Sequence, residues 1–123
     1  MSAKKGHALA KAVVAKFGGS SLADASKFEM VRQIIRDGPA RRIVVPSAPG
    51  KRQPDDHKVT DLLYMCHQLA EHNIEFSDVF SLVTQRFEAI RQSLGLTLDL
   101  AGELDSIREQ IERGASADYV ASR

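Results

Sequence analysis

The feature that most constrains this chain is a short apolar run that ends in paired glycines and serines. The run covers residues 12–15, and it is followed by Lys16, Phe17, Gly18, Gly19, Ser20 and Ser21. This pattern predicts a strand at about residues 12–17 that ends in a tight loop. Glycine lets backbone N–H groups converge on a ligand because no Cβ blocks the approach, and a lysine adds positive charge beside those donors. The pattern is therefore that of a phosphate-binding loop.

The same string also has a plainer interpretation. It contains neither the G-x-x-x-x-G-K-[ST] spacing of a P-loop nor the G-x-G-x-x-G of a dinucleotide-binding turn. Gly18 and Gly19 could simply shape a turn between a strand and a helix, with a serine as the helix cap. The string alone does not decide between a phosphate site and an ordinary turn.

A second strand-like segment follows, with a helical segment between the two. Residues 42–47 read Arg-Ile-Val-Val-Pro-Ser and predict a buried strand that opens into a loop rich in Pro and Gly. Residues 25–37 have helical periodicity, with a capping box formed by Ser26 and Glu29 and an end at Gly38. A strand, a helix and a strand with short connections predict parallel strands and a right-handed crossover.

The remainder of the chain is predicted to be helical. Apolar residues recur at helical spacing over about 60–72, 76–94 and 100–111, and Gly95 and Gly114 end the last two segments. Two strands do not make a balanced parallel sheet, because both faces of such a sheet need helical cover. We therefore expect this chain to be the opening portion of a longer protein.

Composition excludes several classes of function. The chain has 123 residues and a formal net charge of +1, which argues against a nucleic-acid-binding surface. No apolar run approaches the length of about 18 residues that a membrane span needs. Cys66 is the single cysteine, it lies on an apolar stripe, and the histidines show no metal-ligand spacing with it, so we expect neither a disulfide nor a metal site. These properties favour a cytoplasmic protein with a flexible leader at 1–11.

Three blocks together resemble the N-terminal part of the aspartate kinases, which belong to the amino acid kinase superfamily. The blocks are residues 16–24, 44–52 and 58–63, in the order and at the spacing of that family. The resemblance covers about residues 12–123, with its detail in 13–63. It implies an α/β fold, the N-terminal part of a three-layer αβα sandwich with a mainly parallel sheet and a helix-rich second half. It also implies that the domain continues beyond this chain.

The resemblance implies an aspartate kinase, which transfers a phosphoryl group from ATP to the side-chain carboxylate of L-aspartate. The product is 4-phospho-L-aspartate, and the reaction is the first step toward lysine, threonine and methionine. Mg²⁺ is expected to enter with the nucleotide and to need few protein ligands. The full-length form is expected to be a homo-oligomer, and residues 1–123 alone are expected to be inactive.

The resemblance also implies roles for particular residues. Lys16 is the candidate for stabilising charge on the transferring phosphoryl group. Ser47 ends the second predicted strand, and Thr60 fits the N-cap of a helix that starts at about residue 61. Both match family positions that contact aspartate. The candidate phosphate-binding residues are Lys16, Phe17, Gly18, Gly19, Ser20 and Ser21.

Several alternatives stay open. Lys16 could be a solvated lysine at a strand end, and Thr60 could be a helix cap with no further role. The basic loop that contains Lys51, Arg52 and Lys58 is interpreted as solvated and mobile, and these side chains as surface charges and not catalytic groups. The chain could belong to another branch of the superfamily, acting on glutamate, acetylglutamate, carbamate or UMP, or it could be a non-catalytic interaction module.

Overall fold

The computed structural model describes residues 11–122 of the chain. Its elements, in chain order, are β1 (Val13–Phe17), the 3₁₀ helix η1 (Gly19–Leu22), α2 (Ala25–Asp37), β2 (Arg41–Pro46), α3 (Val59–Glu71), α4 (Ser77–Leu94), α5 (Leu100–Glu112) and α6 (Ala117–Ala121). The predicted leader lies outside the described residues except for Lys11, which has no regular structure. Among the helices of residues 11–122, none combines the length and the apolar character that a membrane span requires.

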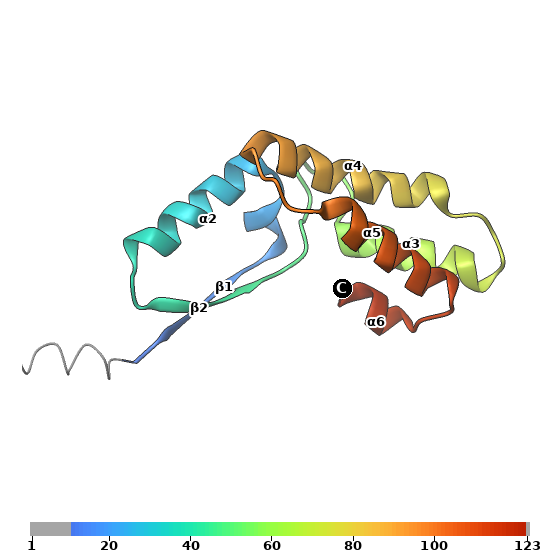
Figure 1. The fold of residues 1–123 in the computed structure, drawn as a ribbon, viewed down its shortest axis with the longest axis horizontal. Coiled ribbons are helices and arrows are strands. Elements are labelled where there is room, and N and C mark those ends of the chain that lie inside the picture. The colour runs from blue at the N-terminus through green and yellow to red at the C-terminus, as the bar shows by residue number, and fades with distance from the viewer. Residues whose placement is uncertain (1–10, 123) are drawn as a thin grey trace, which may run out of the picture.

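β1 and β2 form a two-stranded parallel sheet, and α2 connects them (Figure 1). Val14 pairs with Ile43, and Phe17 pairs with Pro46 at the far end of the sheet. The predicted parallel pairing is confirmed. Because the strands run in the same direction, the loops that follow them leave the sheet at the same edge, where ligands bind in open α/β folds.

Two apolar cores hold the fold together. The smaller core lies between α2 and the sheet and is formed by Phe17, Leu22 and Val31. α4 joins the two parts, because its C-terminal end lies beside α2 while its other end packs among the later helices (Figure 1). Cys66, which lies on the apolar stripe of α3, is fully buried. The larger core, among α3–α6, consists of Val59, Leu62, Leu63, Cys66, Phe76, Phe80, Val83, Leu104, Ile111 and Val120.

β2 is exposed, and the prediction that it would be buried is wrong. The side chains of Ile43, Val44 and Val45 are 50%, 39% and 44% exposed, and Val13 and Val14 on β1 are also exposed. The reason is physical, because within residues 11–122 the sheet has only two strands and its covering helix packs on one face. Burial of a parallel strand needs cover on both faces and a neighbour on each side.

α2 begins at Ala25, where the sequence predicts, but the residue that caps it differs from the prediction. Its N-cap is Asp24, whose carboxylate accepts hydrogen bonds from the Lys27 N–H at 3.0 Å and the Ser26 Oγ at 2.7 Å. A carboxylate caps a helix as well as a hydroxyl does, and Asp24 directly precedes the first helical residue, Ala25. The predicted capping box of Ser26 and Glu29 is therefore wrong.

α3 begins earlier than predicted. Its N-cap is Lys58, which makes no side-chain capping bond, and Thr60 lies inside the first turn. The predicted N-cap role of Thr60 is therefore wrong. The Val59 N–H donates to the Pro49 carbonyl at 3.0 Å, so the loop after β2 fixes where the helix starts. The predicted end of α4 at Gly95 is confirmed, with the glycine in the left-handed region at φ 66°.

Candidate functional site

The loops that follow β1 and β2 lie against each other, backbone to backbone. The Ser47 N–H donates to the Phe17 carbonyl at 2.9 Å, and the Gly50 N–H donates to the Gly19 carbonyl at 2.8 Å. A Cβ on Gly50 would lie 2.7 Å from the Gly19 carbonyl carbon, and one on Gly19 would lie 3.0 Å from the Ala48 oxygen. The close approach of the two loops therefore requires a glycine at position 50 and leaves little room for a side chain at position 19.

A cavity of about 430 Å³ opens where these two loops meet the start of α3. We call it the strand-end cavity. It is lined by Gly19, Ser20, Ser47, Ala48, Pro49, Gly50, Lys51, Lys58 and Thr60. Four residues that the sequence singled out for ligand binding, from three separate segments, thus meet at one hollow: Gly19, Ser20, Ser47 and Thr60.

The groups that line the strand-end cavity suit an anion. Lys51 and Lys58 supply positive charge, and three hydroxyl side chains can donate hydrogen bonds. The first hydrogen bond of η1 runs from the Ser21 N–H to the Gly18 carbonyl at 3.1 Å. The N–H groups of the two preceding residues, Gly19 and Ser20, therefore make no hydrogen bond within this turn. The sequence placed both lysines in a surface loop, and the structure places them, still exposed, at the cavity. Carboxylates and phosphates both fit such a donor set.

Other candidate residues lie outside this cavity. Its lining does not include Lys16, Phe17, Gly18 or Ser21. Lys16 is exposed on β1, opposite Val45, and the Phe17 side chain packs into the smaller core with 8% of its surface exposed. Their parts in phosphate binding stay predictions, and the Phe17 side chain is not available for one, because it packs in the core.

Arg86 on α4 was not singled out by the sequence, and it ties the site together. Its side chain is 4% exposed, the one buried charged side chain within residues 11–122. Its Nη2 donates to the Gly50 carbonyl at 2.6 Å and to the Ala23 carbonyl at 3.1 Å, and its Nη1 donates to the His57 carbonyl at 2.8 Å. One guanidinium thus holds three segments that lie far apart in the chain.

The sequence does carry a signal for Arg86. It follows Val83 by three residues and precedes Ile90 by four, so it lies on the apolar stripe of α4 where another apolar residue is expected. A charged side chain inside such a stripe indicates a buried polar contact, because burial without partners is costly. This pattern predicts that the Arg86 side chain is buried, but it does not predict which groups form hydrogen bonds with it.

The loop between β2 and α3 is held by an ion-pair network around Asp56. Arg52 contacts this carboxylate through two nitrogens, at 2.6 Å and 2.9 Å, and Arg86 Nη1 lies 3.5 Å from it. The hydrogen-bonded Arg52 guanidinium holds the pKa of the Asp56 carboxyl well below its usual range. Burial lowers the pKa of Arg86, and the nearby positive charge of Arg52 adds to that effect. The basic loop that the sequence predicted to be solvated and mobile therefore has a fixed anchor.

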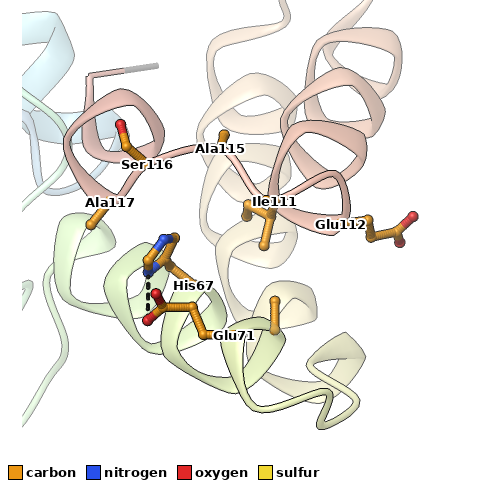
Figure 2. Close-up of a pocket in the computed structure, with 9 residues that line it drawn as sticks. His67, Glu71, Ile111, Glu112, Ala115, Ser116 and Ala117 are labelled. Carbon is orange, nitrogen blue, oxygen red and sulfur yellow. Dashed lines mark ion pairs between the residues drawn. The ribbon is translucent and has the colours of Figure 1, made fainter.

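A second hollow, of about 310 Å³, lies between α3 and the connection from α5 to α6 (Figure 2). His67 and Glu71 face each other there, with 3.6 Å between Nδ1 and Oε1. Such a pair at i and i+4 is ordinary on a helix surface. Ser116 and Ile111 lie on the opposite wall, and none of the residues predicted from the sequence to bind a ligand takes part. We assign no function to this hollow.

The possible metal ligands and the single thiol of residues 11–122 are further candidate groups. Over residues 11–122, no three His, Cys, Asp or Glu side chains gather closely enough to hold a metal ion. Burial raises the pKa of the Cys66 thiol to about 11, so the group is neutral and packs as an apolar side chain.

Comparisons with known proteins point to one family. A scan against protein-family models gives no match. By sequence, the chain is 37% identical over 98 residues to aspartokinase 3 of Bacillus subtilis strain 168, which covers 80% of this chain and 21% of that protein. By structure, it matches the aspartate kinase of Clostridium acetobutylicum with a TM-score of 0.90 and 48% identity, over 93% of this chain and 26% of that one.

Two structures of E. coli aspartokinase III share the fold at lower identity. The complex with aspartate and ADP matches with a TM-score of 0.65 and 23% identity, over 91% of this chain and 26% of that chain. The complex with lysine and aspartate matches with 0.66 and 22%, over 92% of this chain and 26% of that chain. The chain thus spans about a quarter or less of the proteins that it matches. By sequence and by structure, the chain is homologous to the aspartate kinases, and its α/β fold matches their N-terminal part.

Proposed function

We propose that this chain contributes to an aspartate kinase, which phosphorylates the side-chain carboxylate of L-aspartate with ATP. The observation that carries this function is the strand-end cavity, where Gly19 and Ser20 from the first loop meet Ser47 and Thr60. These residues belong to the two sets that the family resemblance links to phosphate and to aspartate. The similarity to aspartokinases from Bacillus subtilis and Clostridium acetobutylicum supports the same function.

The proposed reaction joins two anions. One oxygen of the aspartate carboxylate forms a bond to the γ-phosphorus, while the bond from that phosphorus to the bridging oxygen breaks and ADP leaves. A side-chain carboxyl is already ionised at neutral pH, so no general base is needed. The barrier is mainly electrostatic, and catalysis depends on positioning the substrates and stabilising the developing charge.

We assign roles from this requirement. Ser47 and Thr60 donate hydrogen bonds to the aspartate, and Lys16 stabilises charge on the transferring phosphoryl group. Lys51 and Lys58, at the cavity, reduce the repulsion between the two substrates. The proposed phosphate-binding set is Lys16, Phe17, Gly18, Gly19, Ser20 and Ser21.

ATP is the proposed phosphoryl donor, and the complex of E. coli aspartokinase III with ADP and aspartate supports this choice. The lining of the strand-end cavity contains lysines and hydroxyls but no carboxylate, so we propose that Mg²⁺ arrives with the nucleotide. ATP and free aspartate are cytoplasmic metabolites, so the proposed enzyme acts in the cytoplasm, at the first step toward lysine, threonine and methionine. We propose that its full-length form is a homo-oligomer.

The test is product formation by the full-length protein. ADP release is followed with ATP and Mg²⁺ and with aspartate, glutamate, acetylglutamate, carbamate or UMP as the acceptor. Hydroxylamine traps any acyl phosphate as a hydroxamate. We expect ADP release and hydroxamate with aspartate alone. Release with a different acceptor would place the protein in another branch of the superfamily, and release with none would favour a non-catalytic module.

Residues 1–123 alone serve as a parallel sample. We expect them to form no aspartyl hydroxamate, because phosphoryl transfer needs both substrates within reacting distance and this chain spans only 26% of the Clostridium acetobutylicum enzyme. Clear hydroxamate formation by residues 1–123 would show that the described segment holds both substrates by itself.

A further inference from the structure

We infer that Arg86 is a positioning residue that sets the shape of the strand-end cavity from behind, without contacting a ligand. It is not among the residues that line the cavity. It belongs to α4, an element that contributes none of the lining residues, and its side chain is buried beneath the two loops.

The first step of the argument is the set of groups that Arg86 binds. The Ala23 carbonyl directly follows η1, the Gly50 carbonyl lies in the loop after β2, and the His57 carbonyl precedes α3. The strand-end cavity is built from these same three segments. A planar guanidinium with five fixed donors can span three acceptors, which an ammonium group cannot do in the same geometry.

The second step is the direct link from Arg86 to the cavity wall. Gly50 accepts from Arg86 Nη2 through its carbonyl at 2.6 Å, and its N–H donates to the Gly19 carbonyl at 2.8 Å. Gly19 lines the cavity beside Ser20. The peptide groups of Gly50 therefore connect the guanidinium on α4 to the loop that is proposed to bind phosphate.

The third step concerns energetics. A buried arginine loses its hydration, and a well-packed apolar side chain at this position would often be as stable or more so. The Asp56 carboxylate lies 3.5 Å from Arg86 Nη1 and is also bound in two places by Arg52, while Asp24 adds a second negative charge that acts on Arg86. The contribution that an apolar side chain could not reproduce is geometric, since only the guanidinium fixes three backbone carbonyls at once.

The test compares Arg86→Met and Arg86→Lys with Ile90→Ala in the full-length protein. Ile90 is buried one turn further along the same face of α4 and serves as a control for lost packing. Two properties are measured besides thermal stability. The first is the hydrogen-exchange rate of the Gly50 amide, which needs no catalytic activity, and the second is the pair of steady-state constants kcat and KM. The kinetic arm rests on the proposed kinase function.

We expect Arg86→Met to speed exchange at the Gly50 amide by at least about tenfold, because the hydrogen bond from Arg86 to the Gly50 carbonyl is lost and the loop opens more often. Displacement of the loops should lower kcat/KM for aspartate by about 100-fold, through both kcat and KM. Arg86→Lys should restore part of both properties. Ile90→Ala should lower the melting temperature but leave exchange at Gly50 and the KM values near those of the wild type.

Gly50→Ala supplies an independent variant if Arg86→Met fails to fold. A Cβ at Gly50 would press on the Gly19 carbonyl carbon at 2.7 Å, so the loops must separate and the same kinetic loss should appear. The positioning role is overturned if Arg86→Met behaves like Ile90→Ala, with lower stability but unchanged Gly50 exchange. Absence of kinase activity in the wild type would instead refute the proposed function, and the exchange result would still decide the role of Arg86.

Discussion

Ser47 and Thr60 bring their hydroxyls to the strand-end cavity from different elements. Ser47 directly follows β2, and its N–H is fixed by the Phe17 carbonyl at 2.9 Å. Thr60 lies in the first turn of α3, where no capping bond occupies its side chain. Both hydroxyls are therefore available to a ligand, which favours substrate binding over the purely structural cap that the sequence left open for Thr60.

Removing these hydroxyls should weaken aspartate binding selectively. In the full-length protein, Ser47→Ala and Thr60→Val should each raise the KM for aspartate by about tenfold or more, the usual effect of losing a hydrogen bond to a charged group. The KM for ATP should change little. Ser81→Ala on α4 is the control, because its hydroxyl bonds only to the Asp78 carbonyl in its own helix. Equal losses for both substrates would indicate a folding defect.

The expected effect of replacing Lys16 differs, because Lys16 is proposed to stabilise the charge that develops in the transition state. Lys16→Ala in the full-length protein should lower kcat by about 100-fold to 1000-fold, comparable to the loss of a group that stabilises developing charge. The KM for ATP should change less. Lys11→Ala is the matched control, since Lys11 is also exposed and precedes β1. A near-normal kcat for Lys16→Ala would remove Lys16 from the mechanism.

The residues of the site differ in how readily the sequence revealed them. Gly19, Ser20 and Ser47 could be found because they directly follow strand-like runs, and parallel strands bring such positions to one edge. Arg86 could not be assigned a partner, because Ala23 and Gly50 lie 63 and 36 residues away in the chain. Contacts at that separation depend on how α4 packs, which local patterns do not specify.

At the scale of elements, regular spacing was informative and element ends were less so. The apolar stripes of α4 and α5 repeat every three or four residues, and both helices formed where that spacing predicts. The start of α3 and the capping residue of α2 were predicted wrongly, because several neighbouring polar residues can cap a helix and tertiary contacts choose among them. The burial of β2 was wrong because burial depends on segments that pack from elsewhere.

The N-terminus of α2 offers a test of the corrected capping residue. Asp24→Ala should lower the free energy of unfolding by about 1 kcal/mol at pH 7, and Ser26→Ala should lower it by less. Hydrogen bonds from Ser26 and Lys27 lower the pKa of the Asp24 carboxyl. Its contribution is therefore present above the unfolded-state pKa, about 3.9, and is lost as the pH falls through the lower folded value.

Urea unfolding of the 123-residue chain at pH 7 and at lower pH measures this difference. The gap between the wild type and Asp24→Ala should be full at pH 7 and shrink once the pH falls below about 4. A larger loss for Ser26→Ala than for Asp24→Ala would restore the capping box that the sequence predicted.

For the molecule as a whole, α4 is the element that joins the sheet to the helices (Figure 1). It packs beside α2 at one end and in the larger core at the other, and Arg86 lies on it between the two. The strand-end cavity forms where the two parts meet, so its geometry depends on their relative placement. The exposed side chains of β1 and β2 mark the part of the fold with the least cover within residues 11–122.

Hydrogen–deuterium exchange of the full-length protein, with and without aspartate plus ADP, tests most directly whether this cavity is the substrate site. Ligand should slow exchange in three segments, residues 17–23, 46–52 and 58–62, because they surround the cavity. Exchange around His67 and Ser116, at the hollow of Figure 2, should stay unchanged. Protection confined to that hollow, or no protection in the three segments under conditions where ligand binds, would contradict the assignment of the strand-end cavity.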